Sequence, residues 1–195
     1  MTALATHAVA TDAPSPTDRL LAGSLVAAPL VYLAADTTYA VRGWEADGSG
    51  GVLEVVGSIL YGFALLAVAD RLPRASVLRA VAVLTAIVGA AGNVAYGFDA
   101  IHVSLGDVSL VDRAGSATLI KPLGLCFPLA LLLAAAALAR LGRRTPAALV
   151  ALGAVIFPIA HIGNVPWLAV AGDVVLVLGL TGLAWRRTSA DPDRG

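Results

Sequence analysis

Long apolar segments separated by short polar breaks run along most of the chain. From Leu20 onward these segments are long enough to cross ~30 Å of hydrocarbon as helices that rise ~1.5 Å per residue. The last apolar stretch, from Pro146 to Trp185, is about twice as long as one spanning helix needs, so the break at residues 161–166 divides it in two. The pattern predicts an all-α integral membrane protein, a bundle of six transmembrane helices: Leu20–Val41, Val52–Val68, Val77–Ile101, Thr118–Leu141, Thr145–Ile162 and Pro166–Arg186.

Composition supports this fold class. Of the 195 residues, 58% are hydrophobic and 13% charged, and the mean hydropathy is +0.85. An ordinary soluble domain of this length cannot enclose so many apolar residues in one core. We therefore expect a multi-pass protein of the cell membrane, with the lipid bilayer as its main partner. The formal net charge of zero argues against nucleic-acid binding by the chain as a whole.

The chain is expected to hold a single transmembrane domain over residues 19–187, between disordered cytoplasmic tails at residues 1–18 and 188–195. The first tail is rich in Ala, Thr and Pro and lacks the continuous apolar core of a secretory signal. The single cysteine, Cys126, cannot form an intrachain disulfide and offers no zinc-finger spacing. A homo-oligomer is compatible with this organisation.

The distribution of lysine and arginine predicts how the helices are oriented. Three basic residues, Arg42, Arg113 and Lys121, fall on one side of the membrane in the six-helix topology. The other ten fall on the opposite side, which this bias assigns to the cytoplasm together with both chain ends: Arg19, Arg71, Arg74, Arg79, Arg140, Arg143, Arg144, Arg186, Arg187 and Arg194.

Acidic residues are concentrated in the outer half of this topology, and several lie within the spans. An ionisable group in hydrocarbon costs roughly 2.5 to 3.5 kcal/mol on insertion scales, so such groups normally face a bundle interior or a wet cavity. Their positions therefore indicate a site. Eight of the thirteen acidic residues belong to this set: Asp36, Glu45, Asp47, Glu54, Asp99, Asp107, Asp112 and Asp173.

Helical spacing places several polar residues on shared faces. Asp36 shares an i, i+4, i+7 face with Tyr32 and Tyr39, and the same spacing relates Glu54, Ser58 and Tyr61. Asp36 and Asp173 both lie roughly 10 Å below the outer boundary, where a short carboxyl side chain cannot reach the surface. We expect both to face the bundle interior. The candidate catalytic residues are Asp36, Glu54 and Asp173, and the candidate substrate-binding residues are Tyr32, Tyr39, Tyr61, Asn93, Tyr96, Asp99, His161 and Trp167.

Structural explanations compete with these assignments. Polar side chains on membrane helices often only join helices, which is sufficient for Ser58, Asn93 and Asn164. The side chains of Glu54, His102, Lys121 and His161 lie close enough to helix ends to be solvated by the interface. Aromatic residues also gather at the interface as an anchoring belt, which accounts for Trp44 and Trp167 without any ligand.

Most familiar chemistries have no support in the sequence. The chain has no Walker loop, nucleophile elbow, zinc-protease motif or dinucleotide fingerprint. A single haem could be held only by His102 and His161. A metal site from Glu54, Asp99 and these two histidines is chemically acceptable but has no diagnostic spacing. No cofactor is therefore expected.

The combination of deep acids with aromatic residues indicates a pocket for a small lipophilic or amphiphilic molecule. A poorly solvated Asp36 would favour its protonated form and could protonate an alkene or epoxide, while ring faces stabilise developing positive charge. Glu54, at the start of its helix, would act as acceptor or orienting base. Such chemistry is that of membrane-embedded isomerases and terpene cyclases, although no family motif appears in the chain.

Two other classes remain open. Deep acids with Lys121 as basic partner also describe a small proton- or cation-coupled transporter, although the inner halves of the helices lack ionisable groups. A small accessory membrane subunit without a ligand is the third class. The observation that discriminates between these classes is whether Asp36, Asp173, Tyr61 and Asn93 converge on one cavity, and whether that cavity is closed below.

Overall fold

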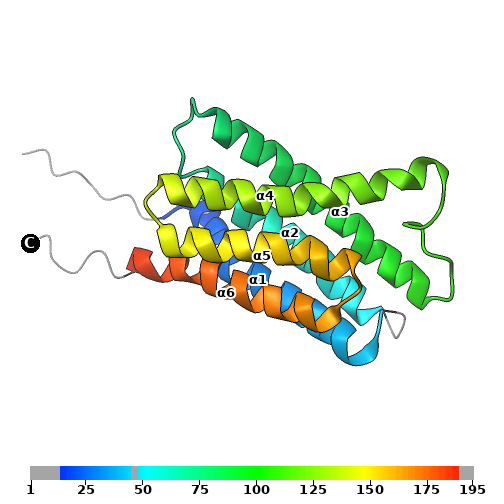
Figure 1. The fold of residues 1–195 in the computed structure, drawn as a ribbon. Coiled ribbons are helices and arrows are strands. Elements are labelled where there is room, and N and C mark those ends of the chain that lie inside the picture. Colours follow the sequence, from blue (N-terminus) through cyan, green and yellow to red (C-terminus); the bar gives the residue numbers. More distant parts are fainter. Residues whose placement is uncertain (1–13, 45–47, 189–195) are drawn as a thin grey trace, which may run out of the picture.

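The computed structural model describes the backbone of residues 14–44 and 48–188, and side chains up to residue 183. The described chain is all-helical, and the predicted bundle of six transmembrane helices is confirmed (Figure 1). Each helix is long and apolar enough to cross a membrane. The helices are α1 (Pro16–Arg42), α2 (Ser49–Ala69), α3 (Val77–Ser104), α4 (Ile120–Arg140), α5 (Arg144–Ile162) and α6 (Pro166–Thr188), and a short 3-10 helix, η1 (Gly115–Leu119), precedes α4.

The helices differ from the predicted spans mainly at their ends. Helix α1 begins at Pro16, four residues before the predicted start, because Ser15 and Asp18 form a capping box. The amide of Asp18 donates to the Ser15 hydroxyl at 3.2 Å, and the Ser15 amide donates to the Asp18 carboxylate at 3.0 Å. Residues 16–18 of the predicted tail are thus the first helical turn. Residues 1–13 and 189–195 of the two predicted tails lie outside the described residues.

The helices form a ring in chain order. Each helix packs against the next, α6 packs against α1, and α2 also contacts α4 across the middle. Helix α1 begins and α6 ends at the same end of the bundle, which we call the terminal end (Figure 1). The opposite end, with the connections 43–48, 105–119 and 163–165, is the loop end. The assignment of the terminal end to the cytoplasm stays a prediction.

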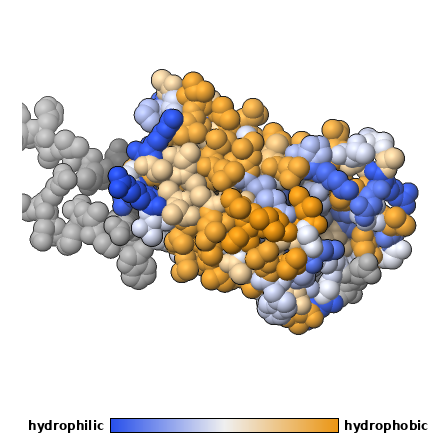
Figure 2. All heavy atoms as spheres, in the orientation of Figure 1, coloured by the Kyte–Doolittle hydropathy of each residue, from blue (hydrophilic) through white to orange (hydrophobic). Residues whose placement is uncertain are grey.

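The outer surface of the bundle matches a lipid environment. Figure 2 shows a broad hydrophobic band over the middle of the helices and hydrophilic side chains towards both ends. Large apolar side chains such as Leu84, Ile87 and Leu178 are exposed on the outside of the bundle. Water would disfavour this arrangement, whereas hydrocarbon tails favour it. The chain is therefore a multi-pass membrane protein.

The interior differs between the two halves of the bundle. Towards the terminal end it is filled by apolar side chains, including Leu25, Val68, Leu138 and Leu180, which have no exposed surface. Towards the loop end, buried polar residues of four helices take their place. Helix α3 approaches α4 closely at Gly92, where an added Cβ would clash with the α4 backbone at Leu123.

Candidate functional site

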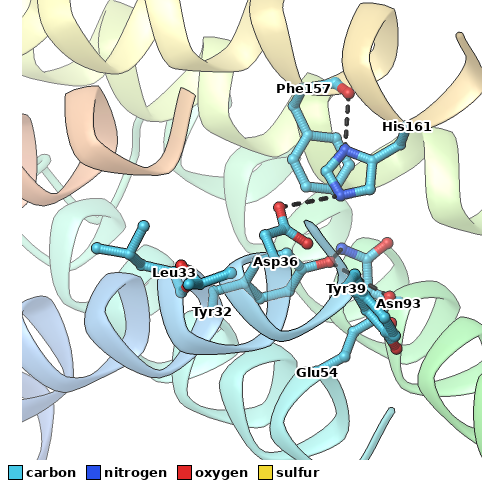
Figure 3. A network of polar contacts seen from close by, with 9 residues as sticks. Tyr32, Leu33, Asp36, Tyr39, Glu54, Asn93, Phe157 and His161 are labelled. Atoms are coloured by element: carbon cyan, nitrogen blue, oxygen red, sulfur yellow. Dashed lines mark hydrogen bonds and ion pairs between the residues drawn. The ribbon is translucent and has the colours of Figure 1, made fainter. Parts of the chain in front are cut away.

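Polar side chains from five helices meet inside the loop-end half of the bundle. The group, which we call the polar centre, consists of Tyr32, Asp36 and Tyr39 of α1, Glu54 of α2, Asn93 of α3, His161 of α5 and Asp173 of α6. Figure 3 shows how most of these side chains converge from their helices. The Asp36 and Asp173 side chains are each 2% exposed, which confirms the expectation that both face the interior.

Glu54 is held by two tyrosine hydroxyls. Tyr39 donates to one carboxylate oxygen at 2.9 Å, and Tyr32 donates to the other at 3.4 Å. The Asn93 amide nitrogen donates to the Tyr32 hydroxyl at 3.2 Å. The sequence left open whether Glu54 is merely solvated at the interface, but its side chain is buried and belongs to this network. Two O–H donors suit a carboxylate, so Glu54 is placed to accept hydrogen bonds or a proton.

His161 contacts the carboxyl group of Asp36. The Nε2 atom lies 3.3 Å from Asp36 Oδ2, and Nδ1 lies 2.9 Å from the backbone carbonyl of Phe157. The imidazole ring also stacks on the Phe157 ring, with a centroid distance of 4.0 Å and an interplanar angle of 23°. These contacts hold the ring in one orientation. They bring together one substrate-binding and one catalytic candidate that are far apart in the chain (Figure 3).

Asp173, on helix α6, is the third buried acid of the polar centre. Its side chain is 2% exposed, and its Oδ2 atom is buried without a hydrogen-bond partner. Asp36 Oδ2 and His161 Nε2 are likewise buried and form no hydrogen bond of good geometry, although they lie 3.3 Å apart. The hydroxyl groups of Ser58 and Tyr61 are also buried without a partner. Buried polar atoms normally find partners, so this concentration of unsatisfied atoms marks the region as more than a packing interface.

The aromatic side chains expected to line a pocket pack mainly against one another. The Tyr32 ring contacts Tyr61 at a centroid distance of 5.6 Å and stacks on Phe127 at 5.9 Å. Phe127 in turn contacts Phe157 at 4.9 Å. The hydroxyl edges of Tyr32 and Tyr39 face Glu54, while the ring faces form an apolar support for the polar centre.

Four predicted substrate-binding residues lie outside the polar centre: Tyr61, which packs against the Tyr32 ring, and Tyr96, Asp99 and Trp167. Asp99 accepts hydrogen bonds from the Ser109 hydroxyl at 2.6 Å and from the amide of Leu110, and so anchors the loop before η1. The Tyr96 ring packs at Gly124 of α4. Trp167 is 62% exposed, a position typical of the anchoring role that the sequence also allowed. A role for these residues in substrate binding stays a prediction.

Two residues that contact the polar centre, Phe157 and Trp44, are not among the predicted site residues. Phe157 supplies the carbonyl and the ring that orient His161, and its only signal was the i, i+4 spacing to that histidine. Trp44 stacks on Tyr39 with a centroid distance of 3.9 Å and meets the His161 ring edge-on. The position of Trp44 next to a helix end fits an interfacial anchor equally well, so the sequence could not distinguish an anchor from a residue that contacts the site.

The candidate metal ligands named in the sequence analysis do not come together in the described part of the chain. Among the described residues, no three His, Cys, Asp or Glu side chains are arranged to hold a metal ion. His102 lies at the loop end with Nδ1 3.4 Å from Asp107, and His161 faces Asp36 instead. Lys121 pairs with Asp112 at 3.4 Å on the surface, so it is not the basic partner of the buried acids.

The charge balance of the polar centre is unusual. Asp36, Glu54 and Asp173 are carboxyl groups, and among the described residues the base in contact with them is His161. One imidazolium can balance one carboxylate, and a further unpaired buried charge would cost several kcal/mol. The remaining carboxyl groups are therefore best satisfied by holding protons.

Comparison with known proteins does not indicate which reaction or ligand belongs to the polar centre. No protein-family model, no curated protein and no solved structure matches the chain.

Proposed function

We propose that this membrane protein binds a small lipophilic or amphiphilic molecule next to the polar centre and isomerises or cyclises it by acid–base catalysis. The observation that carries the proposal is the burial of three carboxyl groups, those of Asp36, Glu54 and Asp173, in the loop-end half of the bundle, with His161 Nε2 3.3 Å from Asp36. Protons held by carboxyl groups in a water-poor interior are suited to the protonation of apolar substrates, because competing water is excluded.

The reaction that fits this chemistry is the protonation of a carbon–carbon double bond or an epoxide. A proton passes from a carboxylic acid of the polar centre to the substrate, and a second proton leaves the resulting cation for a carboxylate. Glu54, which already accepts two hydroxyl hydrogen bonds, is the candidate acceptor. The faces of neighbouring aromatic rings would stabilise the positive charge that develops between these two steps.

The apolar half of the bundle argues against transport. A proton- or cation-coupled path needs polar groups along its whole length, but between the polar centre and the terminal end the buried side chains are mainly apolar. Leu25, Val68 and Leu138, with no exposed surface, lie in that interior. An enzyme, unlike a transporter, needs no path through the apolar half, because its substrate can enter and leave from the loop end or from the adjoining hydrocarbon.

The test is comparative analysis of molecules bound and produced by the protein. Wild-type protein purified in mild detergent should carry a small lipophilic molecule detectable by mass spectrometry. Purified protein incubated in D2O with an organic extract of cells grown in H2O should form a product with one carbon-bound, solvent-derived deuterium per turnover. Asp36→Asn should abolish the labelled product without loss of folding, because an amide cannot act as a general acid or base.

A matched control variant distinguishes the loss of a polar-centre residue from general effects of removing an acid from this membrane protein. Asp107 is an exposed acid of the loop end, so Asp107→Asn should leave bound molecule and labelled product at wild-type levels. Glu54→Gln should reduce the product less than Asp36→Asn does. Absence of both a co-purified molecule and a protein-dependent product from wild-type samples would contradict the proposal.

A further inference from the structure

Exposed arginine side chains are concentrated at the terminal end of the bundle, far from the polar centre. The connection between α2 and α3 carries Arg74, and the turn between α4 and α5 carries three arginines within five positions. The acids that the structure describes at this end are Asp18 and Asp70. This end is therefore strongly cationic, and its four most exposed basic side chains are those of Arg74, Arg140, Arg143 and Arg144.

The two acids of the terminal end already have partners within the chain. Asp70 pairs with Arg79 at 2.7 Å, and Asp18 accepts hydrogen bonds from Ser15 in the capping box of α1. The four exposed arginines make no ion pair with a carboxylate of the described residues. Their charges are thus left for a partner outside the chain.

The two connections that carry these arginines lie at the same level of the bundle. An added Cβ at Gly89 would meet the backbone of Phe127, and one at Gly92 would meet Gly124, so α3 and α4 keep one antiparallel register. Continued to the terminal end, this register places Arg140 level with the start of α3. The turn after α4 is tight, with Gly142 at a φ of 73°, and keeps the remaining arginines at this level.

Apolar faces run from this basic level along the outside of the bundle. Val77, Val81 and Leu84 are exposed on one face of α3, and Leu129 and Leu132 are exposed on α4. Figure 2 shows the corresponding pattern, with hydrophilic side chains at the border of the hydrophobic band. A partner that fits both features carries an anionic group at the level of the arginines and hydrocarbon beyond it.

We infer that the terminal end is a docking surface for anionic phospholipids, whose phosphate groups contact the exposed arginines while their acyl chains lie along α3 and α4. The planar guanidinium group donates two parallel hydrogen bonds to a phosphate, which makes arginine well suited to this partner. Basic clusters directly beside membrane helices also attract anionic headgroups through their charge. The inference concerns the half of the bundle opposite the polar centre, so it does not depend on the proposed reaction.

Thermal unfolding of the delipidated full-length protein in dodecyl maltoside tests this lipid preference. Phosphatidylglycerol should raise the midpoint followed by far-ultraviolet circular dichroism, because a ligand that binds the folded state stabilises it. Phosphatidylcholine with the same acyl chains should raise it far less, and high concentrations of NaCl should weaken the effect of phosphatidylglycerol. Equal stabilisation by both lipids, or no effect of salt, would overturn the inference.

Soluble glycerol 3-phosphate distinguishes a lipid from a free phosphate compound. It presents the phosphate without acyl chains, so it should not reproduce the stabilisation at the same concentration. If it stabilises the protein as strongly as phosphatidylglycerol does, the surface binds phosphate compounds in general and the assignment to a lipid is wrong.

A pair of matched double variants locates the surface. Arg143→Gln with Arg144→Gln removes two terminal-end charges, and neither side chain makes a hydrogen bond in the described structure, so this variant should fold. One arginine near an anionic surface changes affinity about fivefold, so the Kd for phosphatidylglycerol, from native mass spectrometry, should rise about tenfold or more. Arg113→Gln with Lys121→Gln removes two loop-end charges and should keep the wild-type Kd. An unchanged Kd in the terminal-end variant, or an equal rise in both variants, would contradict the assignment.

Discussion

The substitution Gly92→Ala tests how closely helix α3 must approach α4. A Cβ atom at this position would overlap the backbone carbonyl carbon of Leu123 and the amide nitrogen of Gly124. Backbone atoms cannot rotate away as a flexible side-chain end can. The helices must therefore move apart, and contacts on both sides of the crossing are weakened.

The size of this effect can be worked out by comparison with a glycine in open space. Overpacking of this kind costs about 1–3 kcal/mol. Gly23 on α1 has nothing within 4 Å of an added Cβ, so Gly23→Ala changes only the intrinsic helix preference. Because both substitutions gain the same preference of alanine for helix, their difference isolates the steric cost. We expect Gly92→Ala to be less stable than Gly23→Ala by about 1–3 kcal/mol.

The crossing also affects the polar centre. Asn93, the next residue along α3, donates to the Tyr32 hydroxyl at 3.2 Å, and a small displacement of α3 lengthens this bond. Unfolding in mixed micelles by increasing fractions of SDS, followed by far-ultraviolet circular dichroism, measures both variants against wild type. Equal midpoints for Gly92→Ala and Gly23→Ala would refute the close crossing of the two helices.

Two further predictions concern the polar centre and the orientation of the bundle. Tyr39→Phe removes the 2.9 Å hydrogen bond to Glu54 but keeps the ring, so the free energy of unfolding should fall by about 1–2 kcal/mol; wild-type stability in the same SDS titration would mean that this bond contributes nothing. In a Cys126→Ala background, a membrane-impermeant maleimide should label Asp112→Cys in intact cells and Arg143→Cys only after disruption, and labelling of Arg143→Cys in intact cells would reverse the predicted orientation.

The fold class and the number of helices could be predicted from the sequence because both depend on local properties. A run of about 20 apolar residues is a helix that can span hydrocarbon, whatever it packs against. The energetic cost of a carboxyl group in such a run also required that Asp36 and Asp173 face inwards. Both predictions needed only the residue types and their spacing along one helix.

Helix ends were less well predicted. The apolar pattern predicts where a helix leaves the hydrocarbon, but the helix itself continues until its backbone groups find other partners. At Ser15 a capping box provides these partners, which extends α1 beyond the apolar segment.

The partners within the polar centre were decided only by the tertiary structure. His161 and Asp36 lie on helices α5 and α1, which do not follow each other in the chain, and their contact depends on how each helix is rotated and packed. The same rotation places Glu54 under two tyrosine hydroxyls and directs Asp99 to the loop before η1. Residue spacing along a helix shows which side chains share a face, whereas close packing of the whole bundle determines which faces meet.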